Sequence, residues 1–238
     1  MPTCSAAGLL LLADSRLPSG GHVHSGGVEA LVDRGLVRDV DDLAQLLDGR
    51  ARTAGLVAAA FAAAGALTAA RNDGSAGSRG TWAPWDAALD VRTPSAALRE
   101  ASRSQGTALL RTARLAWPMA AGLLGLAEFG RPHHPVLLGA AAVAAGATAG
   151  DAATLAVHHL VGGAATAAVR LLGLDPLRVA AVQAALAPVT DRVACEAAEL
   201  AGLAIAADDP DLLPADAGPL PEILAELHHS SEVTLFAS

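Results

Sequence analysis

The residues of this chain that most suggest chemistry are the glycines and histidines at positions 20–27, here called the glycine–histidine segment. Four glycines flank His22 and His24 in the order Gly-Gly-His-Val-His-Ser-Gly-Gly. Two imidazoles in an extended loop could bind Zn²⁺ or Ni²⁺, but such sites need three or four ligands in total, and only Asp14 and Glu29 are acids close in sequence. We favour the alternative that Gly20 and Gly21 form a tight loop and that His22 and His24 contact a partner.

Three pairs of adjacent histidines occur further along, at 133–134, 158–159 and 228–229. Neighbours on a helix point about 100° apart, so one pair cannot direct both rings at one ion. We predict one buried or capping histidine and one exposed histidine in each pair. A metal shared between copies of an oligomer is the alternative.

Nucleophilic catalysis has two candidate residues, Ser25 and Cys195. Ser25 follows His24, but adjacency in sequence does not make a catalytic triad, and the chain has no G-x-S-x-G motif. Cys195 lies between apolar and acidic neighbours, which predicts a core cysteine. The residues alone therefore indicate no enzyme.

The basic residues exclude several functions, because all 16 are Arg and the chain has no Lys. A P-loop NTPase and a Schiff-base enzyme both require a lysine. The net charge of −8 argues against a nucleic-acid binder and against a surface that seeks anionic lipid.

Two cysteines and the lack of a basic region before the first apolar run predict a cytoplasmic protein. Long uncharged stretches at 55–70, 136–150 and 152–169 have the length of membrane spans. They consist mainly of Ala, Gly and Thr, which drive membrane insertion weakly, so we expect core helices instead.

The elements that must position these residues are predicted to be helices. Hydrophobic residues make up 53% of the chain and aromatic residues only 3%, which favours closely packed helices over sheets. We expect an all-α fold, a single Ala-rich helical bundle of about ten helices. The expected helices lie near 5–13, 25–32, 39–70, 94–117, 118–130, 135–149, 151–172, 176–187, 190–206 and 222–229.

Two segments are expected to lack regular structure. Residues 71–80 are rich in Gly and Ser and predict a flexible loop, and residues 208–221 hold four prolines and predict an extended connector. We therefore divide the chain into an all-α domain at 1–207 and a connector with a C-terminal docking tail at 208–238. Leu235 and Phe236 give that tail an apolar end, as is common in docking elements.

Local signals place several helix starts. Ser25 is expected to cap the helix that carries Val28, and the acids from Asp39 onward favour a helix start there. Thr93-Pro94 and Asp175-Pro176 each predict a cap followed by Pro at the first helical position.

Residues 12–30 resemble the opening of the urease accessory protein F (UreF) family, an apolar L-A-D-S followed by P-x-G-G-aromatic-x-x-S-x-G-L-E. Three further segments match the family in order: residues 97–106 its Arg-rich helix, 168–172 its V-[RK]-L segment, and 235–238 its L-F-x-S ending. His22 stands where the family commonly has an aromatic residue. The chain also departs from the family at 173–176, where Pro-Leu-Gly-Gln is usual, and at Thr234, where Arg is usual.

The resemblance implies an all-α, dimeric chaperone without catalytic activity. Family members bridge the UreD/UreH scaffold and the GTPase UreG, and the assembly delivers nickel to apo-urease. Nickel and GTP would thus act through partners, with no permanently bound cofactor. The implied interface residues are Gly20, Gly21, His22, His24, Ser25, Glu29, Arg170, Leu235 and Phe236.

Two alternatives stay open. Eight histidines could make the chain a nickel-binding metallochaperone in its own right. A small hydrolase using Ser25 or Cys195 is the other.

Overall fold

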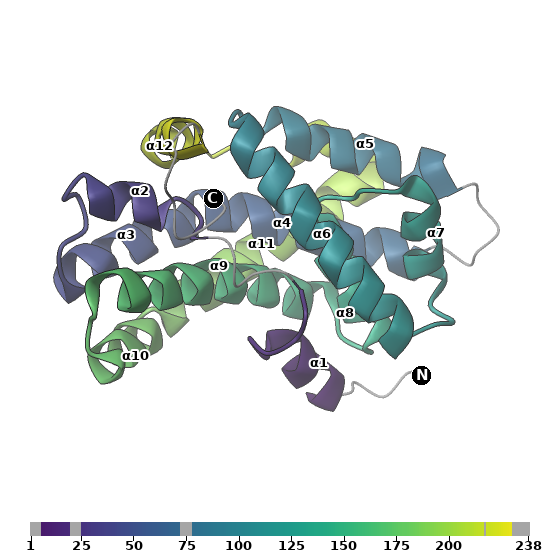
Figure 1. The fold of residues 1–238 in the computed structure, drawn as a ribbon. Coiled ribbons are helices and arrows are strands. Elements are labelled where there is room, and N and C mark those ends of the chain that lie inside the picture. Colours follow the sequence, from purple (N-terminus) through teal and green to yellow (C-terminus); the bar gives the residue numbers. More distant parts are fainter. Residues whose placement is uncertain (1–5, 20–24, 72–77, 217, 230–238) are drawn as a thin grey trace.

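The computed structural model describes residues 6–19, 25–71, 78–216 and 218–229, with twelve α-helices and no strand in these ranges (Figure 1). The all-α class is confirmed, with two helices more than expected. The helices are α1 (Ala6–Ala13), α2 (Val28–Asp33), α3 (Val40–Arg52), α4 (Ala54–Arg71), α5 (Ser78–Val91), α6 (Ala96–Ala116), α7 (Ala121–Phe129), α8 (His134–Ala144), α9 (Ala149–Leu172), α10 (Pro176–Ala185), α11 (Ala187–Ala207) and α12 (Pro219–His229). A 3₁₀ turn, η2 (Pro210–Leu212), precedes α12.

Helix α4 forms the centre of the molecule and packs against α8, α9 and α11. Its residues are apolar on all sides, which is typical of a helix buried all round. Glycine allows the closest approach: a Cβ atom on Gly65 would lie 2.3 Å from the carbonyl oxygen of Val136, and one on Gly139 would lie 2.0 Å from that of Ala62. The backbones of α4 and α8 therefore nearly touch where these helices cross.

Two helices, α4 and α9, are long and apolar enough to cross a membrane by length and composition alone. The apolar window of α4 is 72% buried inside the protein, and that of α9 is 44% buried. The burial of α4 identifies it as a core helix.

The expected single helix from residue 39 to 70 is two helices, because the backbone breaks at Thr53. Helix α3 is amphipathic and buries Val40, Leu43, Leu47 and Ala51, whereas α4 has no polar face. One straight helix could not keep the charged face of α3 in solvent and also run through the core. The break at Thr53 allows α3 to keep its charged face in solvent while α4 runs through the core.

Helix α5 was not expected. It contains Pro84, and its first residues, from Ser78, lie inside the stretch that was predicted to be a flexible loop. The side chains of Trp82 and Trp85 are buried against the rest of the core and stabilise this helix through tertiary contacts. Of the loop predicted at 71–80, residues 72–77 lie outside the described residues. Arg71 and residues from Ser78 onward are helical.

The predicted caps have mixed outcomes. Asp39 accepts hydrogen bonds from the backbone N–H groups of Asp41 and Asp42, and Asp175 accepts one from Leu177. Thr93-Pro94 does not start α6. The N-cap is Ser95, whose side chain accepts a hydrogen bond from the N–H of Leu98, and α6 begins at Ala96.

The segment after α11 is not simply extended, as had been expected. It contains η2, and the guanidinium of Arg92 donates hydrogen bonds to the carbonyl oxygens of Pro210, Asp211, Leu213 and Pro214 at 3.0–3.3 Å. The same guanidinium stacks over the ring of Phe61. Arg92 therefore fastens residues 210–214 to the helical body, and α12 then packs on α2 and α6.

Candidate functional site

The structure describes three of the nine predicted interface residues: Ser25, Glu29 and Arg170. Gly20, Gly21, His22, His24, Leu235 and Phe236 lie outside the described residues. The start of α2 and helix α12 flank them in the sequence, and Arg170 lies at the end of α9.

Ser25 and Glu29 lie below the surface at the start of α2, with 1% and 5% of their area exposed. The hydroxyl oxygen of Ser25 accepts hydrogen bonds from the N–H groups of Gly27 and Glu29 at 3.2 and 3.4 Å. Gly27, with φ of +86°, takes the N-cap position that was predicted for Ser25. Ser25 thus shapes the turn that leads from the glycine–histidine segment into α2, and its burial does not suit a nucleophile.

Arg50 supports the same turn from α3. Its guanidinium donates a hydrogen bond from Nη1 to the carbonyl oxygen of Gly26. Burial lowers the pKa of Arg50 to about 10, although the negative charge of Glu222 has the opposite effect. Arg50 therefore remains a half-buried cation at neutral pH, and its Nε has no hydrogen-bond partner in the described part of the chain.

Helix α12 holds the N-terminus of α6 through two carboxylates. Glu222 accepts a hydrogen bond from the Ser95 N–H at 2.9 Å. Glu226 accepts from the Ser95 hydroxyl at 2.6 Å and from the Ala97 N–H at 2.8 Å. Burial raises the pKa of Glu222, although the hydrogen bond from Ser95 opposes that shift. Carboxylates at a helix N-terminus are favoured by the unsatisfied N–H groups there.

The outer face of α12 carries an apolar stripe. Leu220, Ile223 and Leu227 are 49%, 58% and 50% exposed, whereas Leu224 and Ala225 on the inner face are buried. The spacing of three and four residues places the exposed side chains on one side of the helix. We call these three residues the α12 stripe.

Arg170 lies exposed in the last turn of α9. Helix α9 ends at Gly173, which has φ of +64° and donates a hydrogen bond from its N–H to the carbonyl oxygen of Val169. Glycine thus closes this helix end, as is common.

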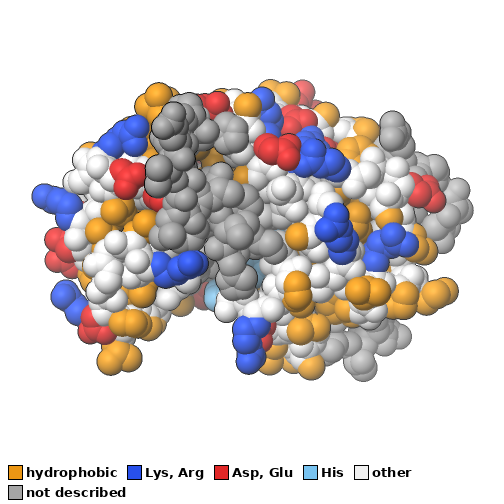
Figure 2. All heavy atoms as spheres, in the orientation of Figure 1, with side chains coloured by type: hydrophobic (Ala, Val, Ile, Leu, Met, Phe, Trp, Pro, Cys, Tyr) orange, Lys and Arg blue, Asp and Glu red, His pale blue; other side chains and the backbone are white. Residues whose placement is uncertain are grey.

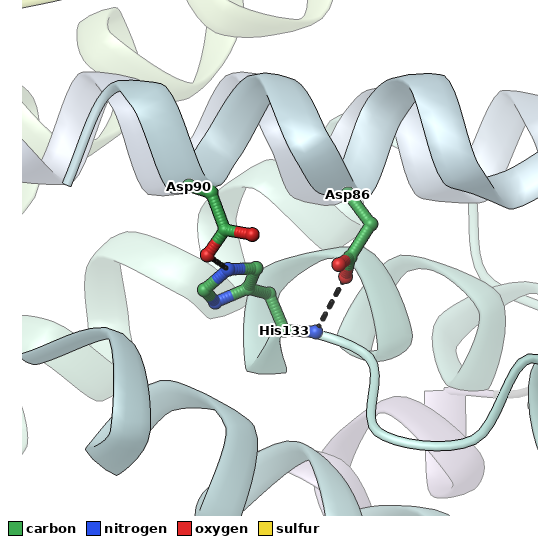
Figure 3. Close-up of side chains that lie close together, drawn as sticks. All are labelled: Asp86, Asp90 and His133. Carbon is green, nitrogen blue, oxygen red and sulfur yellow. Dashed lines mark hydrogen bonds and ion pairs between the residues drawn. The ribbon is translucent and has the colours of Figure 1, made fainter. Parts of the chain in front are cut away.

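Sequence reasoning missed a cluster of Asp86, Asp90 and His133, whose possible ligand atoms lie within 4.8 Å of one another (Figure 3). The two aspartates lie one turn apart on α5, and His133 directly precedes α8. The N–H of His133 donates to Asp86 at 2.7 Å, and its Nε2 lies 2.9 Å from Asp90. The i, i+4 spacing of the aspartates was a visible signal, but α5 itself had not been predicted.

Arg103 of α6 occupies the position that a cation would take in this cluster. Its guanidinium lies 2.9 Å from a carboxylate oxygen of Asp86 and 2.6 Å from one of Asp90. Burial alone would raise the pKa of Asp90, but His133 and Arg103 lower it below its ordinary value. Arg99 also has its Nε 3.9 Å from Asp90, so two cations already face the two carboxylates, and a metal ion would have to displace Arg103.

His133 completes the cluster as a neutral ring. Its Nδ1 lies 3.0 Å from the hydroxyl oxygen of Ser102, and that oxygen also accepts from the N–H of His134 at 3.2 Å. The Ser102 hydroxyl therefore donates to Nδ1, and Nε2–H donates to Asp90. Burial lowers the pKa of His133, although Asp86 and Asp90 oppose the shift. The cluster joins α5, α6 and the start of α8 as a structural connection.

The remaining predicted residues have clear positions. In the pairs that the structure describes, His133 is buried beside half-buried His134, and His158 is exposed beside half-buried His159.

The prediction for Cys195 was wrong: its side chain is exposed on α11, and its Sγ donates to Glu199 at 3.8 Å. Its helical neighbours alternate between buried and exposed faces, and sequence alone could not assign Cys195 to one of them.

Comparison with known proteins gives a consistent result over nearly the whole chain. The UreF family model matches residues 37–187. A urease accessory protein UreF of Mycobacterium sp. (strain JLS) is 47% identical over 234 residues, covering 97% of both chains. The protein of that name from Mycolicibacterium vanbaalenii is 47% identical over 238 residues, covering 98% of this chain and 99% of the relative. One from Mycobacterium marinum is 42% identical over 231 residues, covering 97% of both chains. The chain therefore belongs to the UreF family of urease accessory proteins.

Proposed function

We propose that this chain acts in urease maturation as an adaptor without catalytic activity of its own. In this proposal it bridges the UreD/UreH scaffold and the GTPase UreG, modulates GTP hydrolysis by UreG, and so supports nickel insertion into apo-urease. Family membership supports the role in urease maturation. The bridging role rests on the surface described above.

The α12 stripe is the observation that carries the proposal. Three large apolar side chains are about half exposed on one side of a helix whose inner face is already packed. An amphipathic helix presenting apolar residues at this spacing fits an apolar groove on a partner protein. Leu235 and Phe236 follow in the sequence, and we propose that they bind the same partner.

The chemistry of the chain supports a division of labour among the partners. Without a lysine it has no P-loop to bind GTP, so GTP would act through UreG. Ser25 is buried and accepts two backbone hydrogen bonds, which does not favour the hydrolase alternative. We propose no bound cofactor and no enzymatic activity.

We further propose a homodimer that works in the cytoplasm. The outward residues of α9 include Gly163 and Thr166, which are small enough to let another helix approach closely. The net charge of −8 does not favour nucleic acid as a partner, and the burial of α4 does not favour a membrane.

Co-purification with tagged scaffold protein and UreG tests the proposal. Ile223→Asp with Leu227→Asp should abolish scaffold binding while the melting temperature stays nearly unchanged, because both side chains are already exposed. Deleting residues 232–238 should have the same effect. Leu177→Asp is the matched control, since Leu177 is even more exposed but lies on α10.

Scaffold binding that survives both changes would refute the role of α12 and the tail. A large fall in melting temperature in either variant would show that these residues belong to the core of this chain. Normal urease activation in cells that carry only the double variant would exclude the bridging function altogether.

A further inference from the structure

The C-terminal end of α6 presents two arginines and two large apolar side chains to solvent. Arg111 and Arg114 are exposed, and Leu115 and Met119 are each 86% exposed, the highest value of any large apolar residue in the described part of the chain. The spacing of Arg111, Arg114 and Leu115 places them on one side of α6. Figure 2 shows blue and orange side chains gathered around this end of the helix, at the lower right. We call these four residues the α6 end.

A pocket of about 490 Å³ lies beside the α6 end. Met119 is one of its lining residues and is largely exposed, so the pocket reaches the surface. The lining residues come from α4, the end of α6, α7 and α8, and their side chains are apolar: they include Ala69, Ala116, Trp117, Met119, Ala140 and Val143. Pockets for small molecules normally contain a few polar side chains that orient the ligand. A pocket of apolar side chains instead suits an apolar anchor from a partner protein.

The electrostatics of this region differ from those of the whole chain. The net charge is −8, but no Asp or Glu occurs between Glu100 and Glu128, and helices α4 and α8, which complete the pocket, contain no acid. Other exposed arginines form ion pairs within the chain. Arg111 and Arg114 form none with any residue that the structure describes. A cation in the last helical turn is favoured by the helix dipole, which accounts for Arg114 but not for Arg111, one turn earlier.

We propose that the α6 end and its pocket dock a partner protein, which inserts a large apolar side chain into the pocket and places carboxylates against Arg111 and Arg114. Charge complementarity around a buried anchor is typical of specific interfaces. A membrane fits less well, because a bilayer has no protruding side chain and anionic lipid would meet a chain of net charge −8. A second copy fits less well, because a two-fold contact would bring the same arginines together.

The α6 end is remote from the α12 stripe. Helix α12 holds the N-terminus of α6, whereas the pocket lies at its C-terminus, and 21 helical residues separate the two ends by about 30 Å (Figure 1). An adaptor needs separate surfaces for separate partners. We therefore assign the α6 end to a different protein from the one that binds α12, and in this respect the inference rests on the proposed adaptor function.

Biolayer interferometry with the full chain immobilised tests this surface, with purified scaffold protein, UreG and apo-urease each applied alone. Arg111→Glu/Arg114→Glu and, separately, Met119→Asp should weaken binding of the same one protein by at least about tenfold, because like charges at an interface and a charge in an apolar pocket are both unfavourable. Wild-type affinity for that protein should fall as the salt concentration rises from about 0.05 to 0.5 M. The altered side chains are exposed, so the melting temperature should change little.

Two controls locate the effect. Arg178→Glu/Arg192→Glu makes the same change in net charge at exposed positions on α10 and α11, and should leave every affinity unchanged. Ile223→Asp/Leu227→Asp on α12 should weaken binding of a different protein. If this α12 variant binds all three proteins normally while the α6 variants do not, the proposed role of α12 fails and the docking surface at the α6 end stands.

Unchanged affinity for all three proteins in Arg111→Glu/Arg114→Glu would overturn the proposal. Loss of the same protein from the α6 and the α12 variants would contradict a second docking surface. The face would belong to a membrane if that variant lost only binding to phosphatidylserine–phosphatidylcholine vesicles, and to a second copy if it only dissociated a dimer in sedimentation; either result excludes the proposal. If the charge reversal prevents folding, Arg111→Gln/Arg114→Gln decides, because it must flatten the salt dependence.

Discussion

Helix α8 is held in two places by opposite means. At its crossing with α4, glycine at positions 65 and 139 lets the two backbones approach so closely that no side chain fits between them. Before its first turn, Asp86, Asp90, Arg103 and His133 connect it to α5 and α6 through hydrogen bonds and ion pairs. One contact depends on missing side chains and the other on charged ones.

The two contacts should therefore be sensitive to different changes. The glycine crossing contains no titratable group, so it should respond to added volume and be indifferent to pH and salt. The charged cluster should tolerate changes of shape better but respond to the loss of any one charge. Variants that add volume at the crossing and variants that remove a charge from the cluster distinguish these two responses.

Gly139→Val should have the largest effect. Its Cβ would lie 2.0 Å from the carbonyl oxygen of Ala62 and 2.5 Å from the backbone nitrogen of Ala66, which cannot move without shifting α4. We expect destabilisation of about 3 kcal/mol or more, measured by urea unfolding. Gly202→Ala in α11 is the control, since nothing lies within 4 Å of its added Cβ, and it should stabilise by about 0.5–1 kcal/mol. Equal stability of the two variants would show that the crossing is not tight.

Arg103→Met should come second. It removes the cation that Asp86 and Asp90 share, and Asp86 is buried. We expect a loss of about 2–4 kcal/mol at pH 7. Adding Asp86→Asn should restore part of the stability, because the amide oxygen can still accept from the His133 N–H. If the double-mutant cycle of Arg103→Met and Asp86→Asn shows no coupling energy, the role of the cluster is contradicted.

The pH dependence should come from the buried His133 and the half-buried His159. Burial lowers the pKa of both His133 and His159, the latter to about 4. Below about pH 6.5 the unfolded chain binds protons that the folded chain does not, so stability falls as the pH falls from 6.5 towards 4. His159 alone should contribute up to about 3 kcal/mol across that window.

Chemical unfolding at a series of pH values measures this effect. His159→Gln should flatten the profile, whereas Gly202→Ala should leave its slope unchanged. A profile of the wild-type chain that is flat between pH 6.5 and 4 would show that neither histidine resists protonation.

Arg170→Ala should have the smallest effect on stability, because the side chain is exposed and a cation in the last helical turn is worth only about 0.3–1 kcal/mol. We expect a melting temperature within a few degrees of wild type, together with weaker complex formation with UreG. A pull-down with purified UreG measures the second effect. A normally assembling complex would place Arg170 outside the interface.

The sequence by itself determined most of the helices and the family. Apolar residues at helical spacing, the acids at Asp39 and the Asp175-Pro176 pair are local signals, and they predicted most helices within a few residues. The pattern at residues 12–30 indicated the UreF family. These features were predictable because helix formation and capping depend on residues close in the chain.

Only the tertiary structure decided which residues meet. The break at Thr53, the burial that supports α5 despite Pro84, and the exposure of Cys195 all depend on the position of the central helix α4. Arg92 and the segment it fastens are more than 110 residues apart, and His159 and Leu12 are 147 residues apart. Such contacts leave no periodic signal in one sequence, because they depend on how whole helices pack and not on the propensities of neighbouring residues.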